Sequence, residues 1–407
     1  MPLVISVELD RPGSVYLAGE NIECDIVVSN REEEGTESKP EIIAWISCHI
    51  YGARIVNLHR VKMTASSAND TQQNDDSSKP EDNTSVASIG TSLPVTGSEP
   101  GTCITYSKPV ILCADVLLAP GTTRKFHYVG SLNSDSCTPS FFGKCVQYRY
   151  KMSVALQRVG VPIKLLKIPL LITRLDGLEN VSLQEQQDLK PSNPFLQPSQ
   201  QVNGKQLLLD IANDMIETIT SCKNYHVYNV QTNDVRVCRF MLVKKCFKLG
   251  DTVLGFFDFD RDASSSAPQC VQYFVQLQTE EKVNEDFALK KGQKSHLVTY
   301  AKKHAVCLSY VRDQVSLPIP VSAPQTFHTD YVDVTWRLHF EFVLSKGPIS
   351  GAVTKNLDDS VGWKAPENLP IETLIWDLPI KVFPCSPMIA SMATHNPATV
   401  DRHDLVL

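Results

Sequence analysis

The sequence of 407 residues contains no uninterrupted apolar run of the roughly 18 residues that a membrane-spanning helix needs. Its first residues, Met-Pro-Leu-Val-Ile-Ser, lack the basic segment and the long apolar core of a secretory signal, and we expect them to form a strand. Pro2 also breaks the myristoylation pattern, which requires glycine at that position. These absences predict a cytosolic protein without a membrane span.

An excess of positive charge is also missing. Lys and Arg number 39 against 45 Asp and Glu, which gives a net charge of −6. Proteins that bind nucleic acid through bulk charge carry the opposite balance, because they must neutralise phosphates. We therefore expect no nucleic-acid partner.

The 12 cysteines include no Cys-x-x-Cys pair, which is the usual spacing of zinc ligands. The closest pairs are Cys137/Cys145, Cys238/Cys246 and Cys103/Cys113. In a reducing compartment, such cysteines act as small apolar side chains in the core. We expect free, mostly buried thiols and no metal site.

Catalytic motifs are absent as well. The sequence contains neither type of glycine-rich phosphate-binding loop, no Gly-x-Ser-x-Gly nucleophile elbow and no His-Glu-x-x-His zinc motif. We therefore expect neither an enzyme nor a cofactor, and we assign no catalytic, cofactor-binding or metal-binding residue.

What the chain does contain is a repeated pattern. Residues 15–28 and residues 246–259 each read as two strands with alternating apolar positions, joined at a glycine that can adopt a positive φ. Each joint is a glycine followed by an acid, Gly19-Glu20 in the first stretch and Gly250-Asp251 in the second. We interpret the two stretches as equivalent hairpins.

A long alternating strand follows each of these stretches. Residues 148–157 place a row of apolar side chains on one face, and residues 332–343, which include Trp336, do the same. Their other faces carry polar residues. This pattern predicts strands with one face on a core and the other toward solvent.

A short apolar run containing a proline then follows each long strand. Pro169 lies in residues 167–172, and Pro379 lies in residues 377–382, a run that begins directly after Trp376. Proline donates no hydrogen bond to a neighbouring strand, so both runs are predicted to be edge strands or strand starts. Three features in the same order predict two copies of one β-sandwich.

The predicted organisation is all-β, with two sandwiches and a helical linker. Residues 1–177 form the first sandwich, with a disordered insert at 63–102, where the polar composition cannot supply a core. Residues 178–222 form a linker whose apolar spacing predicts one helix at 205–219. The second sandwich spans 223–385, and 386–407 is predicted to be a mobile tail.

One basic cluster stands out in this acidic chain: Lys290, Lys291, Lys294, Lys302 and Lys303. Such a cluster suits an anionic lipid surface or an acidic partner. An exposed hairpin with solvated lysines is the alternative interpretation, and the sequence leaves both open.

Several stretches together resemble the arrestin fold, namely Val15-Tyr-Leu-Ala-Gly-Glu20, Leu118-Ala-Pro-Gly121 and Pro139-Ser-Phe-Phe-Gly143. Within that fold the chain is similar to Rgp-type proteins, through Thr335-Trp-Arg-Leu-His-Phe-Glu-Phe-Val343, Trp376-Asp-Leu-Pro-Ile-Lys-Val382, Leu277-Gln-Thr-Glu-Glu281 and Ser316-Leu-Pro-Ile-Pro320. The positions that mark the fold in this resemblance are Gly19, Glu20, Gly250, Asp251, Trp336, Trp376 and Pro379.

The resemblance implies a regulatory or scaffold subunit of the Ric–Rgp guanine-nucleotide exchange complex. It would act with a large Ric-type subunit on a Rab GTPase of the Rab-six class in retrograde endosome-to-Golgi and intra-Golgi traffic. It would reside in the cytosol and be recruited peripherally to Golgi membranes. The alternative is a cargo or sorting adaptor like the alpha-arrestins or retromer subunits. Alpha-arrestins carry Pro-Pro-x-Tyr motifs, and this sequence has none.

Overall fold

The computed structural model shows an all-β protein, as the sequence predicts. The structure describes residues 3–30, 40–62, 101–134, 137–176, 204–221, 225–232, 235–259, 268–308, 310–346, 349, 352–355, 361–364, 368–394 and 402–406. The expected insert lies mostly outside these ranges, and its last residue, Thr102, already begins a strand.

Two sheets make up the N-terminal half. One has the strand order β23-β1-β3-β7, and the other has the order β2-β10-β9-β4-β5, with β6 beside β4 and β8 beside β9. The elements are β1 (Leu3–Leu9), η1 (Pro12–Ser14), β2 (Val15–Leu17), β3 (Asn21–Asn30), β4 (Glu41–Val56), β5 (Thr102–Tyr106), β6 (Val110–Leu118), β7 (Thr123–Ser131), β8 (Phe141–Phe142), β9 (Val146–Arg158), β10 (Lys164–Thr173) and the C-terminal β23 (Arg402–Val406).

The C-terminal half repeats this plan. Its sheets run in the orders β11-β12-β14-β17 and β13-β22-β19-β15-β16, with β18 beside β19. The elements are β11 (His226–Thr232), β12 (Val235–Leu242), β13 (Cys246–Lys248), β14 (Thr252–Asp258), β15 (Cys270–Val283), η3 (Glu285–Phe287), β16 (His296–Val306), β17 (Arg312–Pro318), β18 (Phe327–His328), β19 (Val332–Ser345), the ribbon β20 (Ala352–Lys355) with β21 (Val361–Lys364), and β22 (Ile371–Phe383).

Each half has its own apolar core between its two sheets. The predicted alternation is confirmed on both long strands. On β9 the side chains of Tyr148, Tyr150, Met152, Val154 and Leu156 are buried, and on β19 every second side chain from Val332 to Phe342 is buried. Burying one face of a strand fixes its register, because a shift by one residue would expose that face.

The two glycine-acid stretches are equivalent, but they are not hairpins. β2 pairs in parallel with β10 in one sheet, whereas β3 pairs with β1 and β7 in the other. In the same way β13 pairs with β22, and β14 pairs with β12 and β17. The chain therefore crosses from one sheet to the other at each turn.

The prolines lie where a strand has one open edge. Pro169 is opposite Lys151 of β9, and the parallel pairing of β10 with β2 begins two residues later, at Leu171. Pro379 is opposite Arg337 of β19, and the pairing of β22 with β13 begins at Lys381. The missing N–H therefore costs no ladder bond, which explains why proline is tolerated there.

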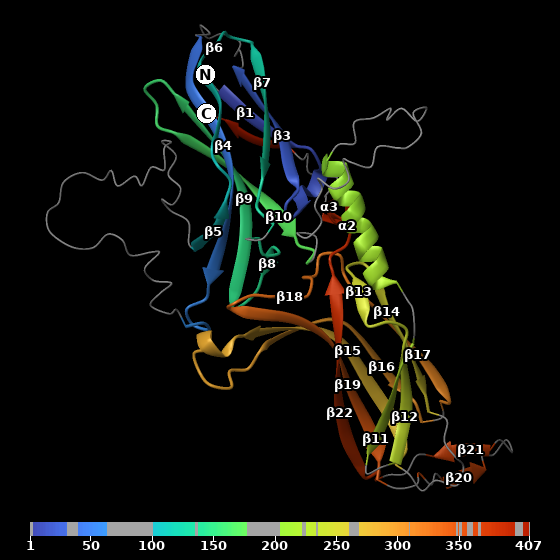
Figure 1. The fold of residues 1–407 in the computed structure, drawn as a ribbon. Coiled ribbons are helices and arrows are strands. Elements are labelled where there is room, and N and C mark those ends of the chain that lie inside the picture. Colours follow the sequence, from blue (N-terminus) through green and yellow to red (C-terminus); the bar gives the residue numbers. More distant parts are fainter. Residues whose placement is uncertain are drawn as a thin grey trace, which may run out of the picture.

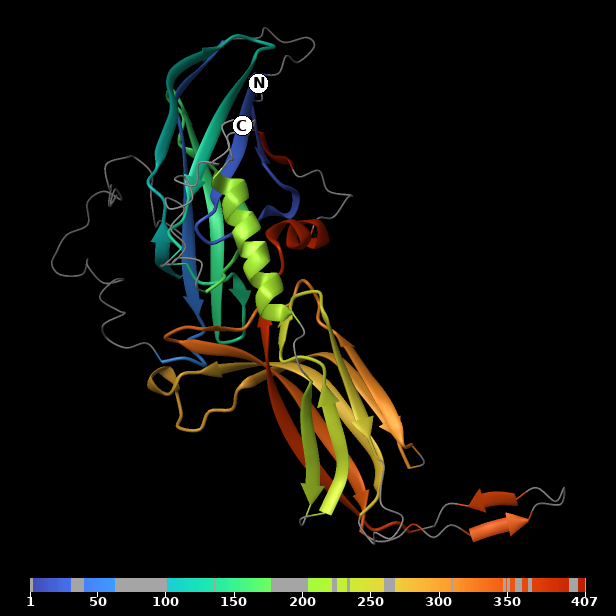
Figure 2. The same cartoon turned by 45° about the vertical axis from the view of Figure 1, so that its right-hand side comes forward.

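The linker helix lies at the junction of the two halves. α2 (Gly204–Thr220) agrees with the helix predicted at 205–219. It buries Ala212 and Ile216 against Leu17 and Leu175 of the N-terminal half, with Phe383 of β22 beside them. In Figure 1, α2 runs along the N-terminal sheets and ends near β13 of the C-terminal half. Figure 2 shows that the β20–β21 ribbon projects away from the rest of the molecule.

The C-terminal segment differs from the expected mobile tail. It contains α3 (Pro387–Thr394), which lies against η1 and β2, and β23, which pairs with β1 in antiparallel register. The Ser, Pro, Ala and Thr content of this segment indicated a mobile tail, but its residues form a short helix and a strand that a non-local partner holds in place. No helix in the part of the chain that the structure describes is both long and apolar enough to span a membrane.

Candidate functional site

The turn at Gly19-Glu20 is closed by its own side chain. Gly19 has a φ of +87°, which is accessible to glycine at little cost. The N–H of Glu20 donates to the carbonyl of Leu17 (3.0 Å). In return, the N–H of Leu17 donates to Glu20 Oε2 (2.9 Å). The acid is therefore required to satisfy the last N–H of β2.

The turn at Gly250-Asp251 has the same construction. Gly250 has a φ of +90°. The N–H of Asp251 donates to the carbonyl of Lys248 (3.0 Å), and the N–H of Lys248 donates to Asp251 Oδ2 (3.1 Å). The positive φ and the acid that the sequence repeats thus form one local motif, which we call the acid turn.

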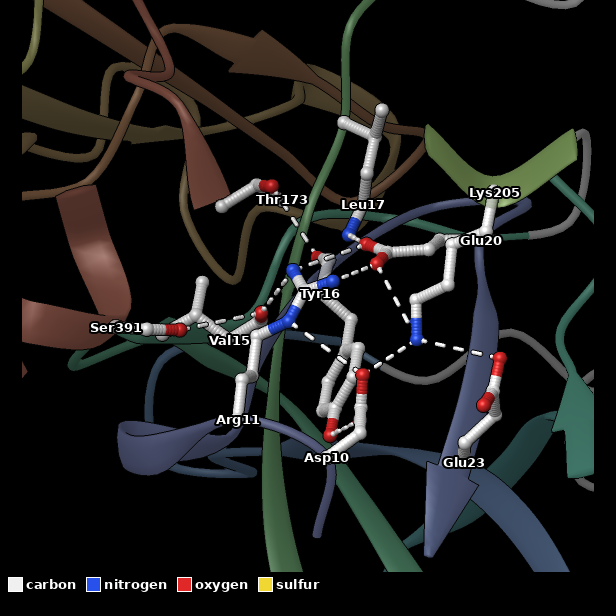
Figure 3. Close-up of polar contacts among 10 residues, drawn as sticks. All are labelled: Asp10, Arg11, Val15, Tyr16, Leu17, Glu20, Glu23, Thr173, Lys205 and Ser391. Carbon is white, nitrogen blue, oxygen red and sulfur yellow. Dashed lines mark hydrogen bonds and ion pairs between the residues drawn. The ribbon is translucent and has the colours of Figure 1, made fainter. Parts of the chain in front are cut away.

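Cations surround the first acid turn (Figure 3). Arg11 donates to both carboxylate oxygens of Glu20, with Nη1 at 3.3 Å from Oε2. Lys205, at the start of α2, forms an ion pair with Asp10 and lies 3.7 Å from Glu23 and 4.0 Å from Glu20. The side chain of Glu20 is 0% exposed and that of Arg11 is 4% exposed. These five residues form a network that joins α2 to the N-terminal half, buried at Arg11 and Glu20 and partly open to solvent at Asp10 and Glu23.

Burial is the largest influence on the carboxyl group of Glu20, and it raises the pKa. The N–H of Leu17 and the cations of Arg11 and Lys205 oppose this rise. The charged form of Glu20 therefore depends on both cations. A lysine in the first turn of a helix is disfavoured by the helix dipole, so its presence at position 205 indicates that the network requires it.

The second acid turn is joined to the other end of α2. Lys244 Nζ lies 2.6 Å from Asp251 Oδ2 and donates to the carbonyl of Thr220 (3.1 Å), the last residue of the helix. Lys248 forms an ion pair with Glu217. The two ends of α2 are thus fastened to equivalent turns in the two halves.

A second polar contact between the halves involves Glu281 of β15, which is 4% exposed. Its carboxylate accepts the N–H groups of Lys144 and Cys145 at 2.8 Å and of Val146 at 3.1 Å, all in the turn between β8 and β9. Three backbone donors on one buried carboxylate hold the two halves in a fixed relation.

An apolar contact supports the same junction. The rings of Phe141 and Phe327 meet edge to face at 5.2 Å, and the hydroxyl of Tyr148 donates to Thr329 Oγ1 (3.0 Å). Beside this contact lies a cavity of about 380 Å³ whose lining comes from both halves and from α3. The lining is mainly apolar and includes Phe142.

The tryptophans and the proline marked by the sequence serve the fold. Trp336 is 1% exposed, and its indole N–H donates to the carbonyl of Pro324 (2.9 Å). Trp376 is half-buried and stacks on Phe340 with ring centroids 4.7 Å apart. Pro379 occupies an open edge of β22, as described above. These three side chains bind other parts of this chain, and the acid turns do the same.

The basic cluster does not form one surface. Lys290, Lys291 and Lys294 are exposed in the loop between η3 and β16. Lys302 is exposed midway along β16, whereas Lys303 lies 2.9 Å from Asp313 Oδ1 and belongs to an ion pair with β17. The alternation of side chains along β16 separates the last two lysines, a consequence that charge counting along the sequence misses.

The described residues contain no group of His, Cys, Asp or Glu side chains that could hold a metal ion. The cysteines among them are free, and most are buried. Burial raises the pKa of the Cys137 thiol to about 11, which keeps it in the unreactive protonated form.

The sequence reasoning missed the cations of the acid turns. Arg11 lies nine positions before Glu20 and Lys244 lies seven positions before Asp251, so each cation is near its acid in the sequence although the two spacings differ. Lys205 gave no such signal, because its partner Asp10 lies 195 positions away.

Comparisons with known proteins agree on one family. The Rgp1 family model matches residues 172–345. The human protein named RAB6A-GEF complex partner protein 2 is 35% identical over 404 residues, which cover 97% of this chain and 98% of the human protein. The protein of the same name from Bos taurus is 35% identical over 386 residues, which cover 93% of each chain.

Proposed function

This chain belongs to the Rgp1 family, and from that premise we propose that it is a non-enzymatic subunit of a guanine-nucleotide exchange complex for a Rab GTPase of the RAB6A class. The observation that carries the proposal is the 35% identity to a RAB6A-GEF complex partner protein over nearly the whole length of both chains. A match of that coverage includes both halves, the linker helix and the C-terminal segment.

The architecture supports a scaffold role. We propose that the two halves are arrestin-like sandwiches, since each has two sheets, an acid turn and a proline-containing strand in the same order. α2, Glu281 and the apolar junction hold the halves together. Such a body offers a partner subunit a large surface of fixed shape, which lowers the entropy cost of assembly.

Exchange of this kind needs no covalent step. A complex that binds the nucleotide-free GTPase more tightly than the loaded one shifts the population toward nucleotide release. By thermodynamic reciprocity, GTP must then weaken the binding of the complex to the GTPase. We propose that the chain contributes to this differential binding together with a large Ric-type subunit.

The cellular setting is a further part of the proposal. We propose that the complex works at Golgi membranes, to which the chain is recruited peripherally from the cytosol, and that it serves retrograde transport. The membrane helices that would make this attachment permanent are lacking in the part of the chain that the structure describes.

The test follows the release of a fluorescent guanine nucleotide from a purified GTPase of the RAB6A class. We expect little acceleration with this chain alone, strong acceleration with the chain and the Ric-type subunit together, and none on unrelated Rabs. Excess GTP should dissociate the complex from the GTPase. If the pair accelerates release from no Golgi Rab, or if the Ric-type subunit does not copurify, the adaptor function replaces this proposal.

A further inference from the structure

Two surface segments far apart in the sequence meet at the junction of the halves. The turn after β4 carries Val61, which forms an isolated β-bridge with Ala288 in the loop after η3. The N–H of Lys62 donates to the carbonyl of Phe287 (2.7 Å). In Figure 1 the end of β4 lies next to the short helical turn of η3.

The contact extends to the far end of the second loop. Gln293 Nε2 donates to the carbonyl of Arg60 (2.8 Å), and Gln293 Oε1 accepts the N–H of Leu289 (3.2 Å). One glutamine therefore shapes its own loop and fastens it to the other half. The two segments form one surface whose parts are held in place by backbone bonds.

This surface is basic with two exposed apolar side chains. Leu58 is 65% exposed and Leu289 is 46% exposed, so both leucines are available to a partner or a membrane. Around them stand the exposed cations of both halves, Arg60, Lys62, Lys290, Lys291 and Lys294. We call these seven residues the junction surface.

We propose that the junction surface docks the protein on an anionic lipid bilayer, with Leu58 and Leu289 entering the headgroup region. Lys and Arg side chains near a membrane are attracted to anionic lipids, and exposed leucines add a second, apolar contribution. Stable attachment needs two such contributions, because one alone gives only weak and reversible binding.

The local charge balance fits this occupant. The exposed carboxylates of the adjoining segments include Glu285 and Asp286 of η3 and Asp330, whose carbonyl accepts a bond from Asn284 (2.7 Å), so three negative charges stand against five positive ones. The chain as a whole carries −6, and a bilayer would therefore repel most of its surface. Both the attraction and the repulsion favour one orientation, with the junction toward the membrane.

Packing contacts already hold the loops of the junction surface in a fixed conformation. Phe287 stacks on Tyr331 with ring centroids 4.2 Å apart, and the guanidinium of Arg54 lies 4.0 Å from the centroid of the Tyr331 ring. Val61 is 1% exposed beneath them. Little chain entropy remains to be lost when the surface meets a membrane.

The proposal rests on the membrane recruitment in the proposed function, and the test separates the two. Full-length protein is sedimented with vesicles of phosphatidylcholine alone and with vesicles of phosphatidylcholine and phosphatidylserine. We expect binding only to the second kind. The triple variant Lys290→Glu, Lys291→Glu and Lys294→Glu should lower the partition coefficient by at least about 100-fold. The double variant Leu58→Ala and Leu289→Ala should lower it by about 10-fold.

A matched control reverses three exposed lysines elsewhere, Lys108→Glu, Lys164→Glu and Lys346→Glu. It makes the same change in net charge and should retain binding. If control and triple variant bind equally poorly, or if the leucine variant binds as well as the parent, the docking proposal is wrong. Loss of the Ric-type subunit from the triple variant would identify the surface as a protein interface instead.

Nucleotide exchange on the Rab in solution, without vesicles, is measured for all variants. We expect it to equal that of the parent in each. If the parent complex itself shows no exchange, the proposed function is wrong. The vesicle experiment tests the docking proposal independently of that result.

Discussion

The two acid turns have the same backbone but different surroundings. At the first turn, Arg11 and Glu20 are side by side with almost no exposure, and Lys205 adds a second cation from α2. At the second, Lys244 and Asp251 retain 22% and 18% of their side-chain exposure. Both turns thus share one hydrogen bond, in which the N–H of the residue three positions earlier donates to the carboxylate of the acid. The cation that pairs with the acid differs between the halves: it is the buried Arg11 at the first turn and the partly exposed Lys244 at the second.

This difference indicates where the junction is most sensitive. A buried ion pair contributes little net stability when complete, because both charges were removed from water. It becomes costly when one partner is deleted, since the other charge remains buried. A partly exposed pair recovers hydration instead. The N-terminal end of α2 should therefore be the stricter of its two attachments.

The largest effect is expected from Arg11→Ala, which leaves Glu20 buried without its closest cation. We predict a loss of about 3–5 kcal/mol in the free energy of unfolding. Chemical denaturation of the full chain, followed by tryptophan fluorescence, measures it. The double variant Arg11→Met and Glu20→Gln should recover part of the loss, because it removes the unpaired charge. A loss below that for Lys244→Ala would contradict the comparison.

A smaller effect is expected from Lys244→Ala at the second turn. Water can reach Asp251, so we predict a loss of about 1–2 kcal/mol in the free energy of unfolding. The variant also removes the donor to Thr220, so amide exchange in the last turn of α2 should accelerate. Unchanged exchange there would show that the helix end is held by other contacts.

Effects of about the same size as that of Lys244→Ala, and equal to each other, are expected from Gly19→Ala and Gly250→Ala. Each places a side chain at a φ near +90°, and the added Cβ meets Ser134 Cβ at 3.3 Å or Val321 Cγ2 at 3.2 Å. Left-handed backbone costs a non-glycine residue about 1–2 kcal/mol. Matching losses of that size would confirm one shared backbone motif, and a clear inequality would mean that the two turns are strained differently.

Sequence patterns predicted what depends on near neighbours. The faces of β9 and β19 followed from alternation, and the positive φ at Gly19 and Gly250 followed from the residue type. The pairing of the flanking strands did not follow, because an alternating pattern is the same whether two strands pair or enter different sheets. The alternating pattern therefore predicted two hairpins, whereas the chain crosses from one sheet to the other at both turns.

The remaining differences also arise from distant partners. β23 is five residues long and is stabilised by β1, at the other end of the chain. α3 has eight residues, too few for its periodicity to distinguish it from a loop. The junction surface combines Arg60 with a loop more than two hundred positions later, as the bond from Gln293 shows. Charge counting found three of the seven residues of that surface, and it added Lys302 and Lys303, which lie on β16.

The pairing of β1 with β23 has a consequence for the order of events during synthesis. β1 leaves the ribosome well before its neighbour β23, which is made of residues 402–406. α3, whose Ser391 hydroxyl donates to the carbonyl of Val15 at 3.4 Å, also arrives late. The edge of β1 in the N-terminal sheet therefore stays unpaired while the C-terminal half is translated and folds. Unpaired strand edges can pair with other chains and aggregate. We therefore expect the edge of β1 to need protection from aggregation until residues 402–406 have emerged.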